Sequence, residues 1–129
     1  MSEDKPYYIK LENRSNYLYA LVGGKELSPQ IAKMYWDEIA AKYGELNVRK
    51  ILIEKDFSRS VTPAEMLEMA NYLGKILAGA KIAFIDRYDN EYINELGKVL
   101  ARNEGVMMRI FEDIKDAERW LIGTGNLTY

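Results

Sequence analysis

The side chains with the most scope for chemistry fall in four short segments, each of which follows a run typical of a β-strand. The segments are Gly23-Gly24-Lys25, Asp56 to Ser60, Asp86 to Asn90, and Glu112-Asp113. The carboxyl ends of parallel strands meet at one edge of a sheet, and ligands bind at that edge. We therefore expect any ligand site along this rim, with these candidate residues: Lys25, Asp56, Arg59, Asp86, Arg87 and Asp89.

Four aspartates among these segments raise the question of a metal. Magnesium prefers carboxylates and water as ligands, and the candidates are Asp56, Asp86, Asp89 and Asp113. The alternative is that they cap helices or pair with nearby arginines on the surface. Asp89 and Asp113 stand where caps belong, so we favour that alternative and expect neither a metal site nor a cofactor.

Three hydroxyl side chains, Ser58, Ser60 and Thr62, precede an expected helix. The N-terminus of a helix stabilises negative charge, so a phosphate or another anion is favoured here. Thr62 and Glu65 have the spacing of a capping box, which is the favoured role for Thr62. Ser58 and Ser60 have no such role and are the more open candidates for a phosphorylation switch.

Tyrosine is frequent, with ten in the chain. Tyr8, Tyr17 and Tyr19 lie in the first two strand-like runs, where they are candidates for an exposed sheet face. Aromatic surface patches mark interfaces, which makes these three residues a possible interaction surface. The equally weighted alternative is that they cover the sheet edge or pack beneath the N-terminal segment.

The composition excludes several classes of function. The 129 residues include no cysteine and no histidine, which rules out disulfides, zinc–thiolate sites, cysteine nucleophiles and histidine-based triads within the chain. The net charge of −2 argues against a nucleic-acid binder. The polar start is not a signal peptide, and no apolar run has the length of a membrane span, so the expected location is the cytoplasm.

The elements that position these segments follow the order β-β-α-β-α-β-α-β-α. Strands are predicted over 7–12, 17–22, 48–54, 81–85 and 106–111, and helices are predicted to start at Ser28, Thr62, Asp89 or Asn90, and Asp113. The first two strands should form an antiparallel hairpin, and the later alternation implies parallel pairing. We expect one domain over 1–129, with loose termini at 1–6 and 123–129.

The strand patterns also bear on where the helices lie. Lys50, Leu52 and Glu54 share one face of the third strand, which indicates that one sheet face is only half buried. A sheet covered on both faces would show continuous apolar strands. Strands in sequential order with crossovers of one hand place their helices on one side. The prediction is a two-layer α/β fold with a five-stranded, mostly parallel sheet and all four helices on one face.

The second half of the chain resembles a known family. The stretches that carry the likeness are Lys81 to Arg87, Ala101 to Val106, Arg109 to Asp113 and Asp116 to Leu121. They resemble the SpoIIAA-like proteins of the STAS superfamily, in the branch also grouped with SEC14-type domains. The likeness runs from about Leu46 to Leu121, and it implies helices on one side of the sheet.

The resemblance also implies a role. Members of the family include anti-anti-sigma factors, which bind a partner kinase and are switched by phosphorylation of a serine at the start of the second helix. The family pattern there is Asp-Ser, a small residue and Gly, whereas this chain reads Asp56-Phe57-Ser58-Arg59-Ser60-Val61-Thr62-Pro63. Ser60 and Thr62 lie closest to the equivalent place. The link to SEC14 domains implies small apolar or lipid ligands.

Three functions follow in order of preference. The first is a non-enzymatic regulatory or protein-interaction domain of the STAS type, with an unknown protein partner or with itself as a homodimer. The second is a carrier of a small apolar ligand or lipid of the SEC14 type. The third is a magnesium-dependent enzyme that uses the aspartates of the rim, ranked last because histidine and cysteine are absent.

Overall fold

The computed structural model describes residues 5–123, so the expectation of loose termini falls mostly outside the described residues. Within that range, no helix has the length and apolar character needed to cross a membrane. The elements are β1 Tyr8–Asn13, β2 Leu18–Glu26, α1 Pro29–Leu46, β3 Lys50–Arg59, α2 Pro63–Leu77, β4 Lys81–Asp86, α3 Glu91–Asn103, β5 Met107–Phe111 and α4 Ile114–Ile122.

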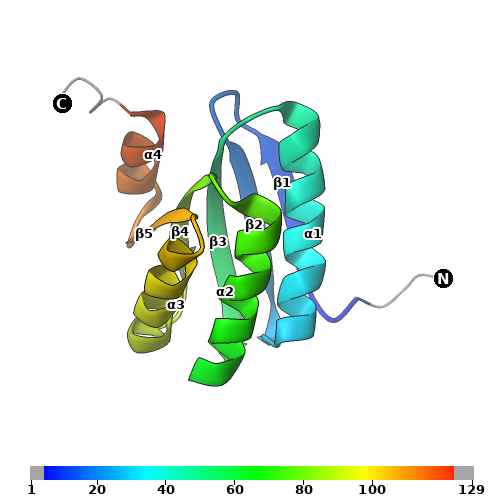
Figure 1. Cartoon of the computed structure of the whole chain (residues 1–129). Coiled ribbons are helices and arrows are strands. Elements are labelled where there is room, and N and C mark those ends of the chain that lie inside the picture. The colour runs from blue at the N-terminus through cyan, green and yellow to red at the C-terminus, as the bar shows by residue number, and fades with distance from the viewer. Residues whose placement is uncertain (1–4, 124–129) are drawn as a thin grey trace.

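The five strands form one sheet in sequential order, β1-β2-β3-β4-β5. The β1–β2 pair is antiparallel and the other three pairs are parallel. Right-handed crossovers between neighbouring parallel strands place α1, α2 and α3 on the same side of the sheet (Figure 1). The predicted α/β class, the strand order and the N-terminal hairpin are confirmed.

The helices begin where cap residues predict. The Ser28 side chain accepts a hydrogen bond from the backbone N–H of Ile31 at 3.1 Å, and Asp113 accepts one from Asp116 at 2.9 Å. Thr62 and Glu65 form the complete capping box. These bonds satisfy N–H groups that have no partner inside the helix.

Two strands extend further than the sequence predicts. β2 continues through Gly23 and Gly24, and β3 continues to Arg59, because the β2–β3 pairing runs on to Glu26 opposite Arg59. A Cβ atom on Gly23 would lie 2.6 Å from the carbonyl oxygen of Asp56 and would also collide with the Tyr8 side chain. Glycine therefore permits a close approach within the sheet here, rather than ending the strand as expected.

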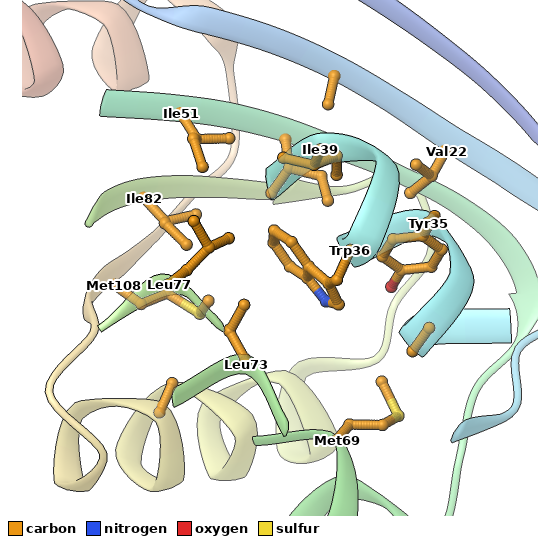
Figure 2. Packing of buried hydrophobic residues seen from close by; sticks show 14 of the residues in the cluster. Val22, Tyr35, Trp36, Ile39, Ile51, Met69, Leu73, Leu77, Ile82 and Met108 are labelled. Atoms are coloured by element: carbon orange, nitrogen blue, oxygen red, sulfur yellow. The ribbon is translucent and has the colours of Figure 1, made fainter. Parts of the chain in front are cut away.

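The main core lies between the sheet and α1, α2 and α3. We call this side of the sheet the three-helix face. Figure 2 shows side chains from α1 and α2 packed against Ile51 and Ile82 of the sheet. The residues that define this core include Val22, Tyr35, Trp36, Ile39, Ile51, Ile53, Met69, Leu73, Leu77, Ile82 and Met108.

The fourth helix corrects the prediction that all helices share one face. Ala117 and Leu121 of α4 pack with Leu52, Ala83 and Ile85, whose side chains alternate with those of the three-helix face, and Figure 1 shows α4 apart from the other helices. The crossover rule concerns helices that join two parallel strands, and within residues 5–123 α4 follows the last strand of the sheet instead of joining two strands. We call this second side of the sheet the α4 face.

Candidate functional site

The predicted rim exists, but the sheet divides its side chains between two faces. Successive residues of a strand point to opposite sides. Lys55 and Asp86 therefore point to the three-helix face, and their neighbours Asp56 and Arg87 point to the α4 face. The rim residues expected to form one ligand site thus belong to separate clusters.

A buried ion pair forms the rim on the three-helix face. Lys55 and Asp86 are opposite each other in the β3–β4 register, with Nζ 3.4 Å from Oδ2 and side chains only 2% and 4% exposed. The ammonium also lies 3.5 Å from the Ser60 hydroxyl and 3.5 Å from Oδ1 of Asn94. Burial lowers the pKa of Lys55, and Asp86 opposes that effect.

Asp86 joins the end of β4 to the loop and helix that follow. One carboxylate oxygen accepts the backbone N–H of Tyr88 at 2.9 Å. The other accepts the amide N–H groups of Asn90 and Asn94, at 3.0 and 2.7 Å. The sequence predicts Asp89 or Asn90 as the cap of α3. Asn90 holds the cap position, but its side chain makes no cap bond and binds Asp86 instead. The position of the 87–90 loop therefore depends on a carboxylate held by Lys55.

A second polar cluster lies on the α4 face. Arg87 binds Glu54 at 3.1 Å and Asp56 at 3.3 Å. The Tyr19 hydroxyl donates to Glu54 at 2.6 Å, and the Tyr8 hydroxyl donates to Asp56. Burial and these hydrogen bonds raise the pKa of Tyr8 and of Tyr19 to about 12. Both phenols stay protonated at neutral pH and act as donors to carboxylates, which is a structural role.

The hydroxyl candidates differ in accessibility. Ser58 is exposed and donates to the backbone carbonyl of Lys25 at 3.0 Å. Ser60 is partly buried beside the Lys55 ammonium. The Thr62 hydroxyl accepts the N–H of Glu65 in the capping box. Arg59 is mostly exposed beside Ser58 and pairs with Glu26 at 3.4 Å.

The structure does not gather the four aspartates considered for magnesium. Asp56 and Asp86 bind partners on opposite faces of the sheet, Asp113 caps α4, and Asp89 lies exposed in the 87–90 loop. Over residues 5–123, no group of three or more carboxylates is placed to hold a metal ion. The residues therefore do not fit the metal shell that a magnesium-dependent reaction would need.

The proposed tyrosine surface needs a correction. Tyr17 and Tyr19 are only 2% and 6% exposed, since they pack with α4 and the Tyr17 hydroxyl donates to Glu118. Tyr8 is 44% exposed, as expected of it. Among the tyrosines of residues 5–123, Tyr92 is the most exposed at 75%, and Tyr88 is 44% exposed. Sequence reasoning gave neither residue a role.

Two open hollows flank the loop that carries Tyr88. One, of about 430 Å³, lies between the ends of β4 and β5 and the start of α3, and Tyr88 lines it. The other, of about 450 Å³, lies between the starts of α2 and α3, where Ser60 and Tyr92 line it. Both hollows are lined by the segment 89–91. The charged side chains that line them are all carboxylates: Asp86, Asp89, Glu91, Glu95 and Glu112.

Sequence reasoning also missed Lys55 and Asn94. The prediction ended the third strand at Glu54, yet the alternation Ile51, Ile53, Lys55, Phe57 continues on one face. A lysine in a core register followed by a core phenylalanine was the available signal. It implies a buried partner, which the neighbouring strand supplies as Asp86.

Comparison with known proteins identifies the fold. No family model matches the sequence, and no curated protein matches it. A crystal structure of an anti-sigma factor antagonist from Mycobacterium paratuberculosis is similar, with 11% identity over 95% of this chain and 99% of that chain, and a TM-score of 0.63. An uncharacterized DUF3478-family protein with a SpoIIAA-like fold, from Shewanella loihica PV-4, is 16% identical over 94% and 98%, with a TM-score of 0.57. The chain therefore has the SpoIIAA-like, or STAS, fold.

Proposed function

We propose that this SpoIIAA-like domain is a non-enzymatic interaction module that binds a protein partner at the rim between the starts of α2 and α3. The observation that carries the proposal is the exposure of Tyr88 and Tyr92 beside the two hollows. Tyrosine is among the residues most enriched at the centres of protein interfaces. Its ring supplies contact area and its hydroxyl keeps the free surface soluble.

The charge of this rim indicates the chemistry of the partner. The carboxylates that line the hollows face solvent apart from Asp86, which Lys55 already neutralises. Complementary charge favours encounter with basic side chains. A segment carrying arginine or lysine next to an apolar anchor fits this surface. One similar structure is named an anti-sigma factor antagonist, a name that describes action against another protein.

A phosphorylation switch is a finer form of the same proposal. A phosphate on Ser60 would lie next to the Lys55 ammonium, 3.5 Å from the present hydroxyl, and would compete with Asp86 for it. A phosphate on Ser58 would sit on the exposed edge beside Arg59. Mass spectrometry of protein from native cells should find a phosphate on Ser60 or Ser58, and unmodified protein would contradict this form.

The alternative of a lipid carrier has less support. The interior cavity has a volume of about 50 Å³, whereas pockets for drug-sized ligands occupy roughly 300–1,000 Å³. A lipid chain would require the helices to separate from the sheet. Partner binding needs no such change.

The proposal can be tested by photo-crosslinking in cells. A photoreactive phenylalanine analogue replaces Tyr92, and a matched variant carries it at Val99, which is 47% exposed two turns further along the same helix. We expect a discrete crosslinked protein from position 92 and none from position 99. The Tyr88→Ala/Tyr92→Ala double variant should lose the partner in affinity capture while its melting temperature stays within a few degrees. Equal crosslinking from both positions, or capture unaffected by the double variant, would overturn the proposal.

A further inference from the structure

A small cavity lies within the core between the sheet and the helices of the three-helix face. Its volume is about 50 Å³, and it lies in the region that Figure 2 shows between Trp36, Met69 and Leu73. The walls are almost entirely apolar and include Trp36, Met66, Met69, Leu73, Phe84 and Met108. Methionine side chains adapt easily, so these walls can adjust to a guest.

Four of the residues lining this cavity carry a polar side-chain group: Tyr35, Trp36, Lys55 and Asn94. Tyr35 and Trp36 both line it and are only 2% and 4% exposed. Among the hydrogen bonds of residues 5–123 there is none to the Tyr35 hydroxyl or to the Trp36 indole N–H, although no polar atom fully sealed from solvent lacks a partner. Figure 2 shows both polar atoms on the side of their rings nearer Met69. Groups in such buried surroundings are nearly always hydrogen-bonded to protein or to water, so a molecule inside the cavity must supply their partner.

The donors define the chemistry of that guest. The indole supplies an N–H and the phenol an O–H, and the Lys55 ammonium at the wall makes three contacts of 3.4 to 3.5 Å, which are long for an ammonium. All three groups donate, so the guest must accept. Burial and the nearby charge of Asp86 raise the pKa of Tyr35 and keep its proton in place. An anion is disfavoured because the walls are apolar and the Lys55 ammonium is already neutralised by Asp86.

We propose that this cavity is a binding site for a small neutral molecule with an apolar body and one carbonyl-type acceptor, held by the Tyr35 hydroxyl and the Trp36 indole N–H. One water-sized guest needs roughly 10–15 Å³ of such volume, so about four non-hydrogen atoms fit. Acetone has this size and chemistry. Acetate has the same number of non-hydrogen atoms and carries a charge, which makes it the matched control.

Nuclear magnetic resonance gives a direct test, because the chain has two tryptophans. Trp120 belongs to α4 and packs on Phe111. It does not line the cavity, so its indole N–H reports solvent effects alone. We expect the chemical shift of the Trp36 indole N–H to change saturably with acetone concentration, with a millimolar Kd. The Trp120 indole N–H should show only a small change that is linear in acetone concentration. Acetate should not shift Trp36 saturably.

Two variants make the test specific. Tyr35→Phe keeps the ring and removes the hydroxyl, and should weaken acetone binding about threefold to tenfold. Ala70→Val adds two methyl groups to the wall of the cavity and should abolish saturation, with folding checked by the dispersion of the amide spectrum. A Trp36 response no larger than that of Trp120 would mean that only water fills the cavity and would overturn the proposal, as would unchanged affinity in Tyr35→Phe.

Discussion

The two faces of the sheet are covered in different ways. On the three-helix face, α1, α2 and α3 bury a continuous apolar core around one ion pair. On the α4 face, a nine-residue helix covers only part of the strands, and a partly exposed network of tyrosines, carboxylates and Arg87 covers the rest. One face therefore depends on apolar burial and the other depends largely on polar contacts.

The difference is sharpest at two consecutive residues. Asp86 is 4% exposed and has its cation on the three-helix face, whereas Arg87 is 45% exposed and pairs across the α4 face. Charges removed from water interact strongly and depend on their partners, while exposed pairs are weakened by solvent and salt. The two faces should therefore respond very differently to loss of a charge.

The largest predicted effect compares these neighbours directly. Asp86→Ala leaves the Lys55 ammonium buried without its anion and should lower the free energy of unfolding by about 3–5 kcal/mol. Arg87→Ala should cost less than about 1 kcal/mol. Urea denaturation of both variants measures the difference. Similar losses from the two would contradict the contrast between the faces.

A smaller contrast is expected for apolar side chains. Leu73 in the main core and Leu121 in α4 are 4% and 0% exposed. Leu73→Ala should lower the free energy of unfolding by about 3 kcal/mol, because three helices and the sheet keep the space left by the side chain from closing. Leu121→Ala should lower it by about 2 kcal/mol, because the short helix α4 can shift to fill the space. Equal urea midpoints would show that α4 is as rigidly packed as the main core.

The smallest effect concerns alkaline pH. The pKa of Tyr19 rises from its ordinary 10.0 to about 12 in the folded protein, so its contribution to stability is complete below pH 10 and disappears as the pH passes 12. The wild-type protein therefore loses stability as the pH rises from 10 to 12. In Tyr19→Phe, this loss in the free energy of unfolding should be smaller by about 1 kcal/mol. Lys55 has the opposite sign, since its lowered pKa makes stability rise with pH toward 10.5. Urea unfolding of both proteins at about pH 9 and pH 11.5 measures this difference. An equal loss of stability in the wild type and in Tyr19→Phe would contradict the prediction.

The sequence predicted the fold because local patterns determine it. Caps at Ser28, Thr62 and Asp113 mark three helix starts, and the alternation of strands and helices implies the parallel order that the structure shows. The side of α4 was not predictable from connection rules, since those rules concern helices that join two strands. The apolar residues Leu52, Ala83 and Ile85 were the signal that the second face also needed cover.

The candidate site was predicted by location more than by residue. The rim lies at the carboxyl ends of the strands, as predicted. Asp56 and Asp86 point to opposite faces of the sheet because both lie within strands that extend further than their apolar runs. Sequence patterns give which residues share a strand face, but they do not give the register between strands. The Lys55–Asp86 pair and the Tyr19–Glu54 bond both depend on that register. Exposure of Tyr92 likewise depends on how α3 packs.

The central claim is that the buried Asp86 carboxylate fixes the 87–90 loop, which carries Tyr88, and hydrogen exchange tests this claim most directly. The Tyr88 N–H donates to Asp86 at 2.9 Å, and the Asp116 N–H donates to Asp113 at the same distance, far along the chain. In Asp86→Asn, we predict that exchange at Tyr88 accelerates at least about tenfold relative to exchange at Asp116. Equal changes at the two amides would contradict the claim.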